Sequence, residues 1–345
     1  LIKDFYIDDI DFNPKSILKK IVLFTLLIQV IGSILLIPGL YKAGDQHFIF
    51  NSIFLSISAF CNAGFSPSSD SLSGFSGNWY VLSIIMGLII LGGIGFVVFT
   101  NIAQKIRFAK KGQIFYLSLH VKIVLISTVV LIVSGFVFTF ISFYKTSLWE
   151  IPLSKRILTA LFESVTLRTA GFETIPQTSF TSSASLFHLV LMFIGGSPGS
   201  IAGGVKTTTA FITLLYLLDG NEQRTTVSFA NRRIPSTIIN KSITIVSRSV
   251  LILLISAISL SYVENHLISN GTISLIDIIY ESVSALATVG LSRGLTPQLS
   301  FLGKLIIIIT MYIGRTGIYA MSIKSGFTGS DNEDLIYPEE SLLVG

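Results

Sequence analysis

Charged side chains are scarce in this sequence: Asp, Glu, Lys and Arg make up only 12% of its 345 residues. An ordinary soluble domain carries about 25%. Apolar residues account for 51% of the chain, and the mean hydropathy is +0.75. So little charge excludes an ordinary soluble globular protein and is typical of a protein that lies in a lipid bilayer.

Cysteine is almost absent as well. Cys61 stands alone, which excludes an internal disulfide. The four histidines are scattered without the spacing of metal ligands. The sequence has no phosphate-binding glycine loop and no nucleophile–base motif, so we expect neither an enzyme nor a cofactor in this chain. The net charge of +5 is modest. Basic residues in the loops between apolar runs are usual in membrane proteins, so nucleic-acid binding is not expected.

The sequence has long apolar runs instead, each close to the roughly 20 residues that cross the hydrocarbon core of a bilayer. One further run, 185–218, is long enough but is interrupted by glycines and a proline. The uninterrupted runs cover residues 17–37, 79–100, 121–143, 242–263 and 302–322.

A pattern repeats along the chain at intervals of roughly 110 residues. A short apolar segment of about three turns ends at Gly64, and similar segments end at Gly171 and Gly290. Each segment is too short to span the bilayer, which predicts a re-entrant half-helix. Long runs precede and follow each one. We expect a glycine-containing break in each following span, at Gly92-Gly93, Gly195-Gly196 and Gly314.

These repeats predict an all-α membrane protein built from helix–half-helix–helix units around a central pore. The expected units cover residues 1–103, 104–217 and 242–325, with a cytoplasmic linker at 218–241 and a cytoplasmic tail at 326–345. Cytoplasmic loops of membrane proteins are enriched in Lys and Arg. The basic residues before the first span and between the units therefore place these segments in the cytoplasm, and the half-helix loops enter the membrane from outside the cell. The basic residues are Lys15, Lys19, Lys20, Lys105, Arg107, Lys110, Lys111, Lys122, Arg224, Arg232, Arg233 and Lys241.

The strand that follows each half-helix is a candidate selectivity filter. Non-helical backbone survives at membrane depth only inside protein or beside water. Several such strands around one axis can replace the hydration shell of a cation with carbonyl oxygens. A lone glycine is usually a helix cap, but three copies in one context favour a filter. The expected filter residues are Asn62, Ala63, Gly64, Phe65, Thr169, Ala170, Gly171, Phe172, Thr288, Val289, Gly290 and Leu291.

Residues 195–204, the glycine-rich loop, hold five glycines, two serines and a proline. A helix interior loses about 1 kcal/mol for each glycine and about 3 kcal/mol for a proline, so the span must break there. The break is either a kink that eases packing or, as we favour, an intramembrane loop that obstructs the pore. The expected gate residues in it are Gly195, Gly196, Ser197, Pro198, Gly199, Ser200, Ala202, Gly203 and Gly204.

Two basic residues belong to this expected gate. Arg315 lies near the middle of the apolar run 302–322, where a charge normally faces a pore, although it could instead reach the membrane surface. A fixed positive charge beneath the filter would raise the barrier for cations. Lys206 either neighbours Arg315 or marks the cytoplasmic end of its helix. Glu163 and Glu281 share one position in two half-helices and either bind backbone donors or attract cations at the mouth.

The motifs at 60–67, 168–172, 195–206, 287–292 and 337–340 resemble signatures of the Trk/Ktr/HKT superfamily of cation transport proteins. The chain is most similar to the bacterial KtrB type of K⁺ uptake subunit, and the likeness covers nearly the whole chain. Members of that family have four units in one polypeptide. The resemblance therefore implies that an N-terminal first unit is missing and that the three visible units are the second, third and fourth.

The resemblance also implies the function: a K⁺-conducting pore subunit of a bacterial plasma membrane, with K⁺ held at the filter. In the family, the glycine-rich loop and an arginine at the place of Arg315 act as the gate. Such subunits form homodimers on a cytosolic nucleotide-binding ring of the KtrA/TrkA type, so nucleotide is expected only on the partner. Two alternatives stay open: Na⁺ conduction or Na⁺-coupled K⁺ transport, and a secondary transporter with broken helices.

Overall fold

The computed structural model describes residues 14–144, 146–219 and 227–316. The expected tail at 326–345, the motif at 337–340 and the end of the last expected span lie outside these residues. Short 3₁₀ turns cover Ser73–Phe75, Ser147–Trp149, Gln177–Ser179 and Thr296–Gln298. The helices and strands are α1 Pro14–Lys42, α2 Phe48–Phe60, α3 Trp79–Ile94, α4 Phe96–Lys110, α5 Leu119–Ser142, α6 Leu153–Thr166, α7 Ser182–Phe193, α8 Thr207–Asp219, β1 Val227–Phe229, β2 Arg232–Ile234, α9 Ser236–Val263, α10 Asn265–Ser269, α11 Leu275–Ala287 and α12 Phe301–Thr316.

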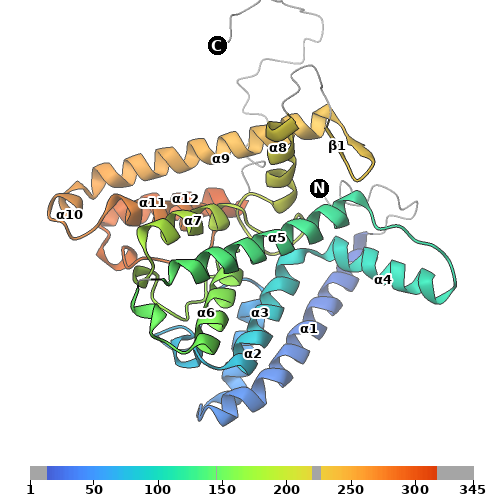
Figure 1. Ribbon diagram of the computed structural model, residues 1–345, viewed down its shortest axis with the longest axis horizontal. Helices are drawn as coiled ribbons and strands as arrows, with labels where there is room; N and C mark the ends of the chain where they lie inside the picture. The colour runs from blue at the N-terminus through green and yellow to red at the C-terminus, as the bar shows by residue number, and fades with distance from the viewer. Residues whose placement is uncertain (1–13, 145, 220–226, 317–345) are drawn as a thin grey trace, which may run out of the picture.

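The predicted unit of a long helix, a half-helix and a second helix occurs three times (Figure 1). The long helices are α1, α5 and α9, and the half-helices are α2, α6 and α11. Each long helix packs on the half-helix of its own unit. The half-helices have 13 or 14 residues, which at 1.5 Å per residue is too short to cross a bilayer. The predicted all-helical membrane fold is confirmed.

Among the described residues, three helices are long and apolar enough to cross a membrane: Leu18–Lys42 of α1, Leu119–Ser142 of α5 and Ser236–Val263 of α9. The pair α3 and α4 adds a fourth if it is counted as one span. Large apolar side chains of α9, including Leu251, Leu254 and Ile258, are exposed. An exposed apolar stripe of this length is expected where a helix faces lipid.

The second helix of the first unit is broken, as expected, but the predicted position of the break is wrong. α3 and α4 meet at 94°. The break falls at Gly95, whose φ of 91° lies where only glycine is unstrained, and not at Gly92-Gly93, which stay helical in α3. A Cβ at Gly95 would lie 2.8 Å from the carbonyl oxygen of Pro198. The bend therefore brings the start of α4 against the glycine-rich loop.

The break expected at Gly314 is also wrong, because α12 continues through it to Thr316. A Cβ at Gly314 would overlap the carbonyl oxygen of Leu286, near the end of α11. A Cβ at Gly92 would overlap the carbonyl oxygen of Phe60, at the end of α2. Both glycines therefore allow the second helix of a unit to cross close to the end of its half-helix.

Regular structure begins inside the range of the linker expected at 218–241. α9 begins at Ser236, directly after Pro235, where a proline can precede a helix without breaking it. Before it lies an unpredicted antiparallel hairpin of β1 and β2. Ala230 and Asn231 at its turn both have positive φ angles of 51° and 60°. Two such residues make the tight turn that suits a two-residue hairpin.

Candidate functional site

The three expected filter strands share an unusual backbone. Each has a left-handed residue two positions before its glycine: Asn62, Thr169 and Thr288, with φ of 49°, 67° and 52°. The glycines that follow have φ of 72°, 80° and 93°. A β-branched residue is a clear outlier in this region, and such strain concentrates at functional sites. Left-handed residues at alternate positions let successive carbonyl groups point to one side, as a cation filter requires.

The fold brings the three strands together, although their glycines are far apart in the sequence. A Cβ at Gly64 would lie 2.7 Å from the carbonyl oxygen of Ala170 and 2.9 Å from the Cα of Gly171. A Cβ at Gly171 would overlap the carbonyl oxygen of Val289. At Gly290 the nearest atom would be the Cα of Gly171, at 3.8 Å. The second strand therefore lies between the first and the third.

Each strand is fastened to its own half-helix. The backbone N–H of Ala63 donates to the carbonyl of Ser58 at 2.9 Å, and the Ser58 hydroxyl donates to the carbonyl of Phe65 at 2.7 Å. In the second unit the Thr166 hydroxyl donates in the same way to the carbonyl of Phe172, at 2.7 Å. These bonds fix the strand on both sides of its glycine.

The outermost filter residues differ between units. Phe65 is 70% exposed, whereas Phe172 and Leu291 are buried. Glu281 of α11 accepts hydrogen bonds from the hydroxyls of Ser292, at 2.7 Å, and Thr296. It therefore binds side-chain hydroxyls and not the expected backbone donors. Glu163, at the matching position of α6, is fully buried.

The glycine-rich loop lies between α7 and α8 and is fastened to the first unit. The backbone N–H of Ser197 donates to the carbonyl of Gly93 at 2.9 Å, and that of Ile201 donates to the carbonyl of Gly92 at 3.4 Å. Because α3 ends at Ile94, the carbonyls of its last turn lack helical partners. The loop supplies partners for two of them.

The same loop touches the start of two filter strands. The backbone N–H of Gly203 donates to the hydroxyl of Thr169 at 3.2 Å. A Cβ at Gly203 would overlap the hydroxyl of Thr288 and the carbonyl oxygen of Ala287. The expected gate residues and the expected filter residues are therefore direct neighbours, in two layers.

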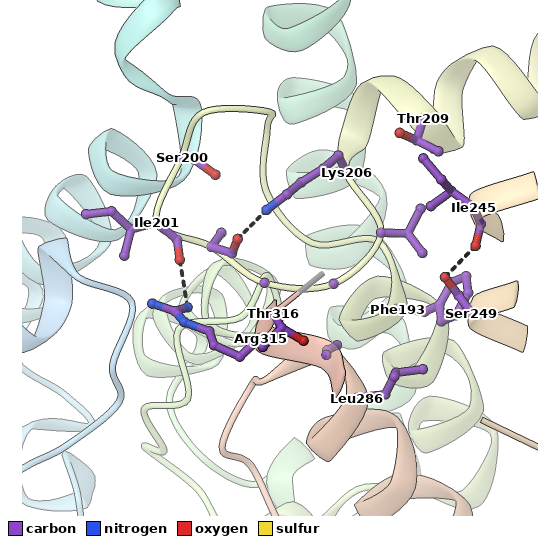
Figure 2. Close-up of a pocket in the computed structure, with 16 residues that line it drawn as sticks. Phe193, Ser200, Ile201, Lys206, Thr209, Ile245, Ser249, Leu286, Arg315 and Thr316 are labelled. Carbon is purple, nitrogen blue, oxygen red and sulfur yellow. Dashed lines mark hydrogen bonds between the residues drawn. The ribbon is translucent and has the colours of Figure 1, made fainter. Parts of the chain in front are cut away.

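Arg315 and Lys206 both hold the loop (Figure 2). Nη1 of Arg315 donates to the carbonyl of Ile201 at 3.1 Å. Nζ of Lys206 donates to the carbonyl of Ala202 at 2.6 Å. Both side chains line a cavity of about 470 Å³ whose walls come from the loop, α9, the end of α11 and α12. Of the two alternatives for Lys206, the structure favours proximity to Arg315.

The sequence interpretation overlooked charged residues just beyond the filter. Glu173 follows the second strand directly, and Arg293 lies three residues after Gly290. Partial burial raises the pKa of the Glu173 carboxyl, and a hydrogen bond from the backbone of Gln177 opposes this increase. The sequence could have pointed to both residues, since a charged side chain so close to a filter glycine is unusual in a chain with few charges.

Comparison with known proteins agrees with this architecture. The family model for TrkH, described as a cation transport protein, matches residues 12–331. The potassium/sodium uptake protein NtpJ of Enterococcus hirae is 34% identical over 328 residues, which cover 93% of this chain and 70% of NtpJ. The Ktr system potassium uptake protein B of Vibrio alginolyticus is 33% identical over 339 residues, which cover 96% of this chain and 71% of that protein.

A solved structure has the same fold. The crystal structure of the potassium transporter TrkH from Vibrio parahaemolyticus superposes with a TM-score of 0.69 at 17% sequence identity. The match covers 92% of this chain and 66%, just under two thirds, of that one.

Proposed function

Because the chain belongs to the TrkH family of cation transport proteins, we propose that it forms the pore of a K⁺ uptake system in a bacterial plasma membrane. The observation that carries this proposal is the set of three adjoining filter strands. Each strand has left-handed backbone at its glycine and at the residue two positions before it, and the glycines lie against one another.

A dehydrated cation would bind to backbone carbonyl oxygens of these strands, which replace its hydration shell. The half-helices α2, α6 and α11 each end where a strand begins. The partly negative C-terminal end of a helix favours a positive ion within about one turn. The carbonyl groups of the strand and the C-terminal end of the half-helix therefore both stabilise a bound cation.

Flux would be limited one layer below the filter. The glycine-rich loop lies against Thr169 and Thr288, so it would obstruct an ion that leaves the filter. The guanidinium of Arg315 adds a fixed positive charge in the adjoining cavity. Because Arg315 also donates to the loop, loss of this bond would both free the loop and move the charge.

We place the filter mouth outside the cell and the opposite end in the cytoplasm. Exposed basic residues support this orientation: Lys105, Arg107 and Lys110 on α4, and Arg232 and Arg233 on the hairpin. In Figure 1 these elements gather on the right, away from the half-helix loops. An excess of Lys and Arg marks cytoplasmic connections.

The chain would work as a homodimer on a cytosolic nucleotide-binding ring. Relatives are named as parts of a Ktr system, both protein B and protein D, which supports further subunits. The ring would bind the nucleotide, and the chain itself would contribute only the pore.

Na⁺ conduction is the second candidate, and one observation favours it: the relative NtpJ is named as a potassium/sodium uptake protein. A secondary transporter with inverted repeats fits less well. Each filter glycine follows its half-helix, and the three glycines lie against one another, so the three half-helices end at one level, whereas inverted repeats would alternate in direction across the membrane.

The deciding experiment is ⁸⁶Rb⁺ uptake by the purified full-length protein in lipid vesicles, with K⁺ and Na⁺ as competitors. We expect K⁺ to halve the uptake at a far lower concentration than Na⁺. Equal competition by the two ions would contradict a K⁺-selective filter, and absence of uptake would contradict a pore.

A further inference from the structure

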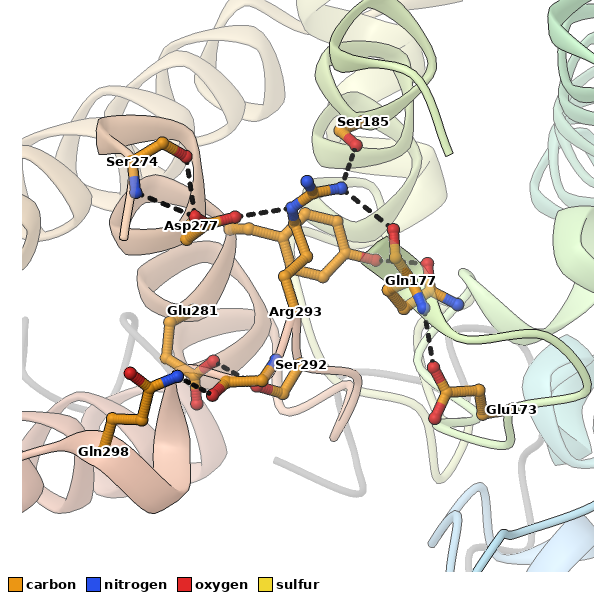
Figure 3. A network of polar contacts seen from close by, with 11 residues as sticks. Glu173, Gln177, Ser185, Ser274, Asp277, Glu281, Ser292, Arg293 and Gln298 are labelled. Atoms are coloured by element: carbon orange, nitrogen blue, oxygen red, sulfur yellow. Dashed lines mark hydrogen bonds and ion pairs between the residues drawn. The ribbon is translucent and has the colours of Figure 1, made fainter. Parts of the chain in front are cut away.

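Arg293 joins two pore units just beyond the filter (Figure 3). Its side chain is only 12% exposed, and its Nε pairs with Oδ1 of Asp277 in the same unit at 2.6 Å. Its Nη1 donates to the carbonyl of Gln177 at 2.9 Å and to the hydroxyl of Ser185 at 2.7 Å. Both of these acceptors belong to the second unit, so one buried side chain crosses the boundary between units.

The partner of this arginine is itself fixed. Oδ2 of Asp277 accepts hydrogen bonds from the backbone N–H of Ser274 at 2.9 Å and from its hydroxyl at 2.6 Å, at the start of α11. One turn further along α11, Glu281 holds the hydroxyls of Ser292 and Thr296. Residues on either side of Arg293 are therefore tied to the half-helix of the third unit.

The polar contacts continue to the first unit. The Tyr280 hydroxyl donates to Oε1 of Gln177 at 2.8 Å, and the Gln177 backbone N–H donates to Oε1 of Glu173 at 2.8 Å. The Glu173 backbone N–H donates to the hydroxyl of Ser71 at 3.1 Å, and its carbonyl accepts from the N–H of Leu72 at 2.8 Å. We call this chain of contacts from Arg293 to Ser71 the outer belt.

The outer belt and the glycine-rich loop act at opposite ends of the strands. Belt residues Glu173 and Arg293 follow the filter glycines, whereas the loop touches Thr169 and Thr288 before them. Gly171 lies directly against Val289. A movement of the third unit away from the second would therefore change the distance between facing carbonyl groups.

We propose that Arg293 is a positioning residue that sets the ion selectivity of the pore by fixing the third filter strand against the second. This inference rests on the proposed conduction of cations. Hydrogen bonds with a charged partner are shorter and about twice as strong as neutral ones. All three bonds of Arg293 have this charged partner, and the guanidinium fork suits several acceptors at once.

A direct effect of the Arg293 charge on the ion is the weaker explanation. Asp277 neutralises it at 2.6 Å, so an ion at a distance meets a dipole and not a net charge. The field of a pair this close falls off faster than that of a single charge. Geometry is therefore the route by which Arg293 reaches the filter.

The test uses Arg293→Gln and the double variant Arg293→Gln/Asp277→Asn, which removes the ion pair without changing net charge. Lys304→Gln, at an exposed position in the first turn of α12, is the matched control for loss of one positive charge. The measurement is ⁸⁶Rb⁺ uptake in vesicles by the full-length protein. The concentrations of Na⁺ and K⁺ that halve uptake give a ratio that does not depend on the amount of folded protein.

We expect both belt variants to lower the Na⁺/K⁺ ratio by at least about threefold, because selectivity is a difference between two affinities. Lys304→Gln should leave the ratio unchanged. Arg293→Lys should fall between wild type and Arg293→Gln, since an ammonium group cannot present the fork. If Arg293→Gln does not fold, Arg293→Lys and Ser185→Ala give the answer, because each weakens the same link.

The outcomes separate this inference from the proposed function. If wild-type protein does not distinguish K⁺ from Na⁺, the selective pore itself is wrong. If wild type is selective and the belt variants keep its ratio, the positioning role is overturned, even where uptake falls. A shift in Arg293→Gln that the double variant reverses would also overturn it, because the cause would then be the unpaired charge of Asp277.

Discussion

The filter strands and the glycine-rich loop are both irregular backbone inside a helical body, but they are held in different ways. Each filter strand is fastened to the half-helix just before it, as Ser58 and Thr166 fasten the first and second strands. The loop has local bonds at its base, such as that from Lys206 to the carbonyl of Ala202. It is also held by distant elements: α3 of the first unit, Thr169 of the second strand and Arg315 of α12.

This difference has a mechanical consequence. A strand supported by adjacent residues keeps its shape wherever its unit is placed, which is why one backbone pattern occurs three times. A loop supported by distant elements depends on how those elements pack. The loop can therefore be released while the filter stays intact, as a gate requires.

The largest expected effect comes from damage to the filter itself. Gly171→Ala should reduce ⁸⁶Rb⁺ uptake by about 100-fold or more. It forces a left-handed backbone on alanine, at roughly 1–3 kcal/mol, and it drives a Cβ into the carbonyl oxygen of Val289. The matched variant is Gly290→Ala, with similar backbone strain but a nearest contact of 3.8 Å. Equal uptake by the two variants would contradict the close approach of strands described here.

Deletion of the glycine-rich loop should raise the initial uptake rate by about tenfold, which corresponds to a barrier lower by roughly 1.4 kcal/mol. The Na⁺/K⁺ competition ratio should stay near the wild-type value, because the half-helices still hold the strands. An unchanged rate would remove the gating role of the loop. A lost ratio would show that the filter depends on the loop after all.

Arg315→Gln should raise the uptake rate by a few fold, about threefold to tenfold. The change removes a fixed positive charge that opposes cations and weakens the bond to Ile201. Lys206→Gln, which alters the neighbouring bond to Ala202, is the companion variant and should have a smaller effect. Both rates are read in the same vesicle assay. A slower Arg315→Gln protein would contradict the barrier role.

The smallest effect concerns stability where the two regions meet. Gly92 lies against Phe60 of a half-helix, and its carbonyl accepts from Ile201 of the loop. Gly92→Ala should destabilise the protein by about 1–3 kcal/mol, the range for overpacked sites. Gly87→Ala, in the same helix with nothing within 4 Å of its Cβ, is the control and should stabilise the protein by up to about 1 kcal/mol, the difference in helix propensity. Thermal unfolding in detergent compares the two, and equal midpoints would contradict the tight crossing.

The sequence by itself determined the helical membrane class and the repeated half-helix. Both follow from properties of nearby residues: apolar runs of sufficient length, and short segments that end in glycine. The break in the run 185–218 is of the same kind, because five glycines and a proline cannot form a stable helix interior. The expected filter and gate residues were also chosen from local patterns.

Only the tertiary structure decided which glycines bend a helix. A single glycine costs a helix about 1 kcal/mol, which packing can outweigh. Gly92 and Gly314 stay helical because their missing side chains let a half-helix end approach. Gly95 takes the bend and lies against the loop.

The outer belt was likewise hidden from the sequence. Arg293 and the carbonyl it contacts in Gln177 are 116 positions apart, and no local pattern joins them. The local sequence decides whether a segment forms a long helix, a half-helix or a loop, because this depends on neighbouring residues in the chain. Which side chains meet at the filter depends on how three separate units pack, and that is decided only when the whole chain folds.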